Sequence, residues 1–295
     1  MGVKRLILEK VKSTLQIIID WMKANRMQLN VEKTQMILIG SPAVIKSIGT
    51  VSVEVGGHVI TSVDKIKSLG LIIDSELKWL DHVKLKTREG NSVLWSLWPM
   101  QSSISEFNRK LIVNSYILPV ISYMSMIWGT ANTTIVKLIE SIIRRSGRFV
   151  LGLQKYDNVK LDITDKLKWL FPSNIYQFEV LKLANAIINK TCPPYFNNYL
   201  NLEFNLKNTR NREYVNCSHP VTRYGRRCFS YNAILALPIL NNIDCSSANV
   251  KVFNSKIKKY LLDKQLKHAT QKNSSDFECT CDYSCIDDVV NSVIM

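Results

Sequence analysis

Glycine and proline are scarce in this chain, with 11 and 8 copies among 295 residues. That scarcity excludes a collagen-like or low-complexity chain and argues against an all-β protein dense in turns. Apolar residues still make up 46% of the sequence. This content excludes a disordered basic tail, because enough side chain is present to bury a core. The length allows one large domain or two ordinary ones.

Long apolar runs are also missing. Residues 111–136 hold no charged side chain, but Asn114, Ser115 and Pro119 interrupt them. No stretch of about 18 consecutive apolar residues occurs, which is the length that a membrane helix needs. We therefore expect a buried helix pair bent at Pro119, and no membrane among the partners of the chain.

Cysteine is absent before Cys192, and the total of seven is an odd number. Charged side chains interrupt the N-terminal segment where a signal peptide would need a continuous apolar stretch. Both observations predict an intracellular, reduced protein of the nucleus or cytoplasm. Cys279, Cys281 and Cys285 lie close together near the C-terminus, but their spacing does not match the ligand pairs of structural zinc sites. We expect no metal site there.

Acidic residues are outnumbered by basic ones, 24 against 39, which gives a formal net charge of +15 and a pI near 9.5. The excess is concentrated in residues 77–150, with 10 basic against 4 acidic side chains, and in 203–268, with 12 against 4. Such an excess favours a nucleic acid or an anionic membrane surface as partner. The alternative is ordinary solubilising charge.

The first 76 residues mix helical and strand patterns. Apolar residues recur every three or four positions from Val3 to Met22 and predict a long helix ending near Asn25. A short strand is expected at 35–39, a β-hairpin with a two-glycine turn at 51–60, and another strand at 66–73.

Helical periodicity dominates the rest of the chain. Residues 203–245 look irregular and basic, and residues 253–266 predict a final amphipathic helix. The expected fold class is therefore α+β, with a small helix-and-strand piece followed by a mostly α-helical part. The other expected helices lie near 81–97, 106–118, 120–128, 134–150 and 174–190.

Residues 21–34 carry a more specific signal. The string Trp21-Met-Lys-Ala-Asn25-Arg-Met-Gln-Leu-Asn30-Val-Glu-Lys33-Thr34 resembles a segment of reverse transcriptases from non-LTR (LINE-type, jockey-like) retrotransposons. These enzymes show a long helix, then Trp-Phe-x-x-Asn-x-Leu-x-Leu-Asn-x-x-Lys-Thr, then a strand. Further similarities follow in the same order and extend the resemblance over about residues 5–265. Lys67-Ser68-Leu69-Gly70 resembles a Phe-Leu-Gly primer-grip turn, and Leu77, Trp79 and His82 resemble the start of the thumb. A thumb signature is matched by Pro119, Tyr123, Trp128 and Gly129, and the helix after it by residues 142–153. The family's C-terminal region is matched by Pro194-Tyr195-Phe196 and Thr209-Arg210.

The resemblance implies four regions. Residues 1–76 correspond to a palm remnant of a helix plus antiparallel strands, and 77–150 to a thumb-like helical domain. Residues 151–268 correspond to a basic, mostly helical C-terminal region, and 269–295 form an acidic tail with cysteines that we expect to be disordered.

The departures from the family concern catalysis. Family polymerases join nucleotides with two Mg²⁺ ions held by palm aspartates, two of them in an aromatic-Ala-Asp-Asp turn just before the first helix. The only adjacent aspartates here are Asp287-Asp288, in the acidic tail. We therefore expect a truncated reverse transcriptase (RNA-directed DNA polymerase) fragment with no cofactor of its own, inactive as this chain alone.

The expected partners are RNA, DNA or an RNA–DNA duplex, bound without sequence preference, and also the remainder of the polymerase or the element's RNA. Two alternatives remain open. The chain is the downstream part of an active polymerase, or it is a domesticated helical scaffold that binds protein.

The resemblance also assigns roles to single residues. Lys33 aligns with a lysine near the incoming nucleotide and would be vestigial without the aspartates, and its alternative is a solvated lysine at the start of a strand. Leu69 and Gly70 align with the primer-grip turn, where glycine lets backbone approach a nucleic acid, and their alternative is an ordinary buried strand.

Basic residues of the helical part are candidates for nucleic-acid binding. A thumb holds the phosphates of a duplex by shape and charge, and an aromatic ring between arginines can stack on an unpaired base. A solvated loop or helix face is the alternative for each cluster. The candidates are Arg109, Lys110, Arg144, Arg145 and Arg148 in the thumb-like helices and Arg223, Tyr224, Arg226 and Arg227 further on.

Overall fold

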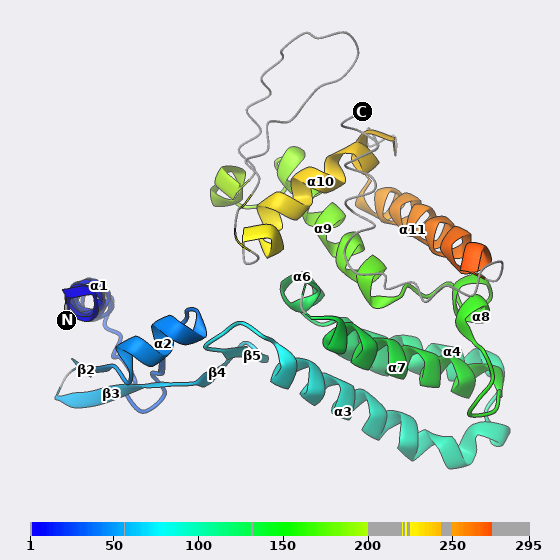
Figure 1. Cartoon of the computed structure of the whole chain (residues 1–295), viewed down its shortest axis with the longest axis horizontal. Helices are drawn as coiled ribbons and strands as arrows, with labels where there is room; N and C mark the ends of the chain where they lie inside the picture. The colour runs from blue at the N-terminus through cyan, green and yellow to red at the C-terminus, as the bar shows by residue number, and fades with distance from the viewer. Residues whose placement is uncertain are drawn as a thin grey trace, which may run out of the picture. The chain divides into compact units, whose positions relative to one another are not determined.

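The computed structural model describes residues 2–55, 57–130, 132–199, 220, 222, 225–242 and 249–272. The chain divides into two compact units, one ending at His82 and one beginning at Val83. About 66% of the structure is helical, and the described strands are few and short, so the predicted α+β fold with a helical C-terminal part is confirmed. Figure 1 shows the strands confined to the first unit among the described elements.

The first unit is a helix on a small sheet. Helix α1 (Gly2–Ala24) packs its apolar stripe, which includes Val11 and Leu15, against Val53, Val55 and Ile60. The sheet has the order β1 (Met36–Ile37), β3 (His58–Val63), β2 (Ser52–Val55), with β1 parallel and β2 antiparallel to β3. The predicted helix, short strand and hairpin are thus confirmed.

A short helix, α2 (Pro42–Ile48), follows the first strand and is not among the elements predicted from the sequence. Its start nevertheless follows ordinary capping rules. The Ser41 hydroxyl accepts a hydrogen bond from the Val44 amide at 3.4 Å, and Pro42 occupies the first turn, where no amide hydrogen is needed.

The single strand predicted at 66–73 is wrong, because the chain reverses in the middle of it. β4 (Lys65–Ser68) and β5 (Leu71–Asp74) form an antiparallel hairpin in which Ser68 lies opposite Leu71. Leu69 and Gly70 have φ angles of 47° and 82°, the left-handed pair that a type I′ turn requires. The residue pattern alone predicts one strand here, although the resemblance to a primer-grip turn places a turn at the same residues.

The carboxylate of Asp74 organises the chain that leaves β5. It accepts hydrogen bonds from the backbone amides of Glu76, Lys78 and Trp79, at 3.2, 2.8 and 2.7 Å. Buried His82 accepts from the Ile72 amide through Nδ1 at 3.4 Å. These bonds order the chain between β5 and the first turn of the next helix, α3 (Leu80–Leu97).

The second unit is helical throughout its described residues. After α3 come η1 (Trp98–Ser103), α4 (Glu106–Ile112), the π-helical η2 (Val113–Ile117), α5 (Leu118–Ser122), α6 (Ser125–Trp128) and α7 (Thr133–Leu151). The π-helical turn directly precedes Pro119, which is where the sequence predicts a distortion. The helix predicted at 120–128 is divided, because Met124 adopts a left-handed conformation with φ 55°.

The next helices form a second packing centre. They are α8 (Lys160–Asp165), α9 (Pro172–Ile188), η3 (Pro194–Tyr199), η4 (Gly225–Arg227), α10 (Phe229–Asn242) and α11 (Val250–Lys272). Val180 and Leu181 of α9, Ala233 of α10, and Phe253 and Ile257 of α11 are buried together. The expectation of irregular chain at 203–245 is wrong for α10, whose apolar residues show no one-sided stripe and include a proline, which argues against a helix.

A buried amide joins three of these segments. The Gln265 side chain of α11 donates to Thr164 Oγ1 at 2.5 Å and to the Trp169 carbonyl at 3.1 Å. Its carbonyl oxygen accepts from the Phe171 backbone amide and from Asn174 Nδ2, both at 2.9 Å. Gln265 is 8% exposed, so these bonds form away from water and replace its hydration fully.

Candidate nucleic-acid interface

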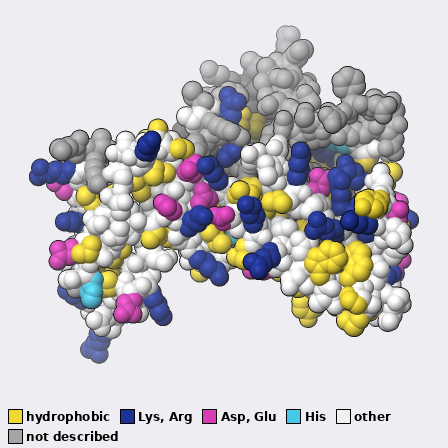
Figure 2. Space-filling view, turned by 60° about the horizontal axis from the view of Figure 1, so that its bottom comes forward, with side chains coloured by type: hydrophobic (Ala, Val, Ile, Leu, Met, Phe, Trp, Pro, Cys, Tyr) yellow, Lys and Arg dark blue, Asp and Glu magenta, His cyan; other side chains and the backbone are white. Residues whose placement is uncertain are grey.

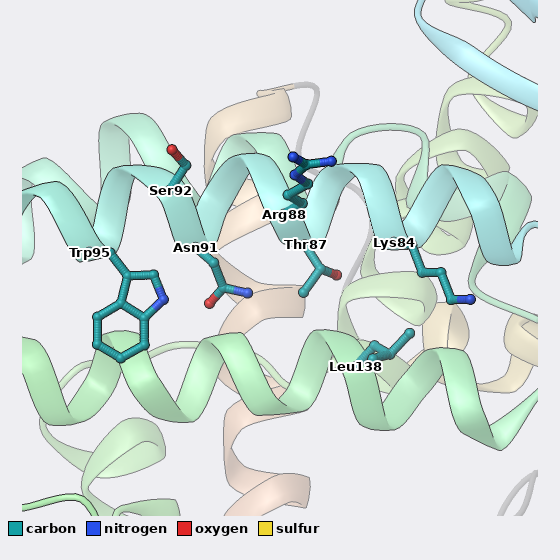
Figure 3. A pocket seen from close by; sticks show the side chains of 7 residues that line it. All are labelled: Lys84, Thr87, Arg88, Asn91, Ser92, Trp95 and Leu138. Atoms are coloured by element: carbon teal, nitrogen blue, oxygen red, sulfur yellow. The ribbon is translucent and has the colours of Figure 1, made fainter.

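A groove of about 430 Å³ lies between α3 and α7. Its α3 residues follow one another at helical spacing, so one face of that helix builds it. Figure 3 shows Thr87, Asn91 and Trp95 pointing from α3 toward α7, where Leu138 lies opposite. The lining residues are Lys84, Thr87, Arg88, Asn91, Ser92, Trp95 and Leu138.

Two exposed cations border this groove. Lys84 and Arg88 lie one turn apart on α3, and neither forms an ion pair within the described part of the chain. Lys86, between them in sequence, instead pairs with Glu89 at 2.9 Å and lies over the Tyr123 ring. Lys84 and Arg88 are therefore the α3 cations available to a phosphate group.

Of the predicted arginines on α7, only Arg145 reaches the groove. It is exposed and donates to Asn91 Oδ1 at 3.1 Å. Arg144 instead pairs with Glu140 one turn before it, and Arg148 donates to the Asp157 carbonyl at 3.0 Å. The three side chains are all on α7, as expected, but Arg144 and Arg148 bind partners other than the groove residues.

Arg109 serves the end of α7. Its guanidinium donates to the Gln101 carbonyl at 3.1 Å, and the Gln101 amide donates to the Phe149 carbonyl at 2.8 Å. The last turn of a helix leaves carbonyl groups that need such partners. Arg109 is half-buried, and these contacts give it a stabilising role that requires no nucleic acid.

Lys110 lies near a second lysine. Its ammonium donates to the Lys166 carbonyl at 3.2 Å. The pKa of Lys258 on α11 is lowered, first by burial of its ammonium group and then by the positive charge of Lys110. The fold therefore brings together two basic residues from helices far apart in sequence, although away from the groove lining.

The basic–aromatic cluster further on is described in part. Arg226 and Arg227 lie on η4, where Arg226 is exposed and donates to the Pro220 carbonyl at 3.4 Å. Arg223 and Tyr224 lie outside the described residues. The proposed alternation of stacking ring and arginine therefore stays a prediction.

The candidate residues of the first unit lie before a strand and at the tip of a hairpin. Lys33 is exposed just before β1, and its backbone amide donates to Asn30 Oδ1 at 3.1 Å. Leu69 is 84% exposed at the tip of the β4–β5 hairpin, next to Gly70. The buried-strand alternative for these two residues is wrong, since an apolar side chain projects into solvent from a turn.

The Leu69 conformation yields a stability prediction. A leucine with φ 47° is strained, whereas asparagine tolerates that region and is preferred in type I′ turns. We expect Leu69→Asn to raise the free energy of unfolding of the first unit by about 0.5–1 kcal/mol in a urea titration. Leu69→Ala removes the same apolar surface without that preference and should leave stability nearly unchanged. A destabilised Asn variant would contradict the strained turn.

The thumb-like signature residues pack together. Trp128 is 1% exposed and its indole donates to the Tyr123 carbonyl at 2.7 Å. Gly129 allows α6 to approach α9, because a Cβ there would lie 2.6 Å from the Tyr176 side chain. The sequence signature thus corresponds to a requirement of packing.

The face in Figure 2 combines charge with exposed apolar side chains. Many basic side chains lie on it, with apolar clusters among them. Trp95, Phe107 and Tyr116 are exposed by 57%, 74% and 64%. Because an exposed aromatic ring can stack on a base, such rings matter most where they lie beside cations, as Trp95 does.

The groove residues of α3 were not among the sequence candidates. The signal that could have found them is the recurrence of Lys84, Arg88, Asn91 and Trp95 at intervals of three and four within a predicted helix. That spacing places them on one face, but only the position of α7 makes the face a groove.

No family model, curated protein or solved structure matches this chain. In the described part of the chain, no three histidine, cysteine or acidic side chains gather where they could hold a metal ion. None of the described helices is both long and apolar enough to cross a lipid bilayer.

Proposed function

We propose that this chain is a reverse-transcriptase-derived protein that binds RNA or DNA through the phosphate backbone and does not join nucleotides by itself. The observation that carries the proposal is the α3–α7 groove, which is lined by Lys84, Arg88, polar side chains and an exposed indole, and whose Asn91 accepts a hydrogen bond from Arg145. Lys84 and Arg88, which form no ion pair with the described residues, suit phosphate contacts, which give affinity without sequence preference.

Two further observations support the origin of the chain in such an enzyme. The residues that resemble the primer-grip turn form the tip of a tight hairpin, with Leu69 exposed. The residues that resemble the thumb signature, Tyr123, Trp128 and Gly129, pack within one unit. The absence of an adjacent aspartate pair other than Asp287-Asp288 supports the lack of polymerase activity.

A domesticated protein-binding scaffold is the second candidate. It is favoured by Phe107 and Leu111, which are exposed by 74% and 55% and lie one turn apart on α4. Exposed apolar side chains on one helix face are typical of protein interfaces.

The two candidates differ in their salt dependence. We expect the affinity for an RNA–DNA duplex to fall between about 50 and about 200 mM salt, with a log–log slope near −3 for about three neutralised phosphates. Filter binding or fluorescence anisotropy measures it. No binding, or binding without a salt slope, would favour the scaffold. Templated primer extension by this chain alone would contradict the absence of polymerase activity.

A further inference from the structure

We propose that the α3–α7 groove holds one unpaired nucleotide of a single strand, with its base stacked on the Trp95 indole. This inference rests on the proposed function, because it specifies that the same groove prefers single-stranded nucleic acid. Three features of the groove carry it: a fixed aromatic platform, an unsatisfied buried hydroxyl, and cations on the rim.

The aromatic platform, Trp95, packs against other aromatic rings. The Trp95 ring lies 5.5 Å from the Trp98 ring, centroid to centroid, and Trp98 lies 5.7 Å from buried Phe149. This chain of rings anchors Trp95 to the core while 57% of its surface stays exposed. A ring that is already ordered loses little entropy on stacking, and a base can use its exposed part.

The floor of the groove contains a polar group that has no partner. Thr87 is 7% exposed, and its hydroxyl forms no hydrogen bond with the described residues. Buried polar groups are normally satisfied, so this hydroxyl is able to form a hydrogen bond with a group that enters the groove. Asn91 lies one turn further on and uses its oxygen for Arg145, which leaves its amide nitrogen able to donate. The two groups offer hydrogen bonds to the edges of bases that lie along the groove.

These contacts select an unpaired nucleotide. In a duplex each base is covered on both faces by its neighbours, and its pairing edge is occupied. An unpaired base exposes both, so it can stack on the indole and reach the Asn91 amide one turn away, while the Thr87 hydroxyl, a further turn along α3, is left to the next base of the strand. The groove volume, about 430 Å³, lies within the range of small-ligand sites. Lys84 and Arg88 precede Trp95 by eleven and seven residues on α3, so they suit phosphates further along the same strand.

The test uses the full chain and a DNA single strand of about 12 nucleotides with one 2-aminopurine, beside a blunt duplex of the same sequence. We expect binding to quench the 2-aminopurine in the single strand and not in the duplex. Trp95→Ala should abolish the quench and weaken single-strand binding about fivefold or more, with duplex affinity unchanged. Trp95→Phe, which keeps a ring, should retain most of both.

Two further variants keep the test decisive. Thr87→Val removes an unsatisfied buried hydroxyl at nearly constant volume, so the protein should not lose stability while single-strand affinity falls about threefold. Tyr156→Ala removes a ring that is 87% exposed outside the groove and should change neither affinity. Salt-dependent binding by the wild type with no loss in Trp95→Ala, or an equal loss for the duplex, would overturn the inference alone. No binding of either DNA by the wild type would instead overturn the proposed function.

Discussion

Reversing both rim charges of the α3–α7 groove, in the double variant Lys84→Glu/Arg88→Glu, is expected to weaken RNA–DNA duplex binding on the order of 10- to 100-fold at about 50 mM salt. The reason is that two side chains without internal ion pairs change from attracting phosphates to repelling them. The log–log salt slope should become shallower by about two, since two phosphate contacts are lost. Anisotropy titrations at several salt concentrations measure both quantities.

The matched control changes the same net charge elsewhere. Lys10→Glu/Lys12→Glu reverses two exposed cations of α1 and leaves the groove intact. We expect it to lower affinity by much less than the groove variant, through the general field alone. Equal losses in both double variants would mean that total charge, and not the groove, determines binding. A thermal melt of each variant confirms that the fold is retained.

Replacing Gln265 with leucine is expected to lower the free energy of unfolding by about 3 kcal/mol or more. The Phe171 backbone amide and the Asn174 side-chain amide would lose their acceptor in the interior. Each buried donor left without a partner costs about 1–3 kcal/mol, and leucine cannot replace the bonds to Thr164 and Trp169 either. A denaturant titration followed by circular dichroism measures the change.

Lys259→Ala serves as the control in the same helix. Its side chain is exposed, so the substitution keeps α11 intact and should change stability by less than about 0.5 kcal/mol. If Gln265→Leu were as stable as this control, the hydrogen bonds of the Gln265 amide would not stabilise the second unit. The association of α8, α9 and α11 would then depend on apolar contacts.

Helices with long, one-sided apolar patterns could be predicted from the sequence. The segments predicted at 81–97 and 134–150 correspond to α3 and α7 within one residue at each end. α10 was missed because it is apolar around much of its circumference, which removes the periodic signal. The turn inside the β4–β5 hairpin was missed by pattern, because a leucine rarely occupies a left-handed position.

The candidate site could be predicted only in part, because sequence does not say which side of a basic helix meets which neighbour. Arg145 was found, but Arg109 has the same charge and donates to the Gln101 carbonyl of η1. An arginine that binds phosphate and an arginine that binds a backbone carbonyl cannot be distinguished from the sequence alone. The groove itself depends on α3 and α7 lying side by side, although Asn91 and Arg145 are 54 positions apart.

The hydrogen bonds of Gln265 can form only late in the synthesis of the chain. Its partners Thr164 and Asn174 leave the ribosome about 100 residues earlier. At about 5–20 residues per second, they wait on the order of 5–20 s before α11 is made. During that interval α3 and α7 are already outside the ribosome and can pair locally, while the interior of α8 and α9 still lacks its last polar partner. The α3–α7 groove would then be in place before the second unit is closed.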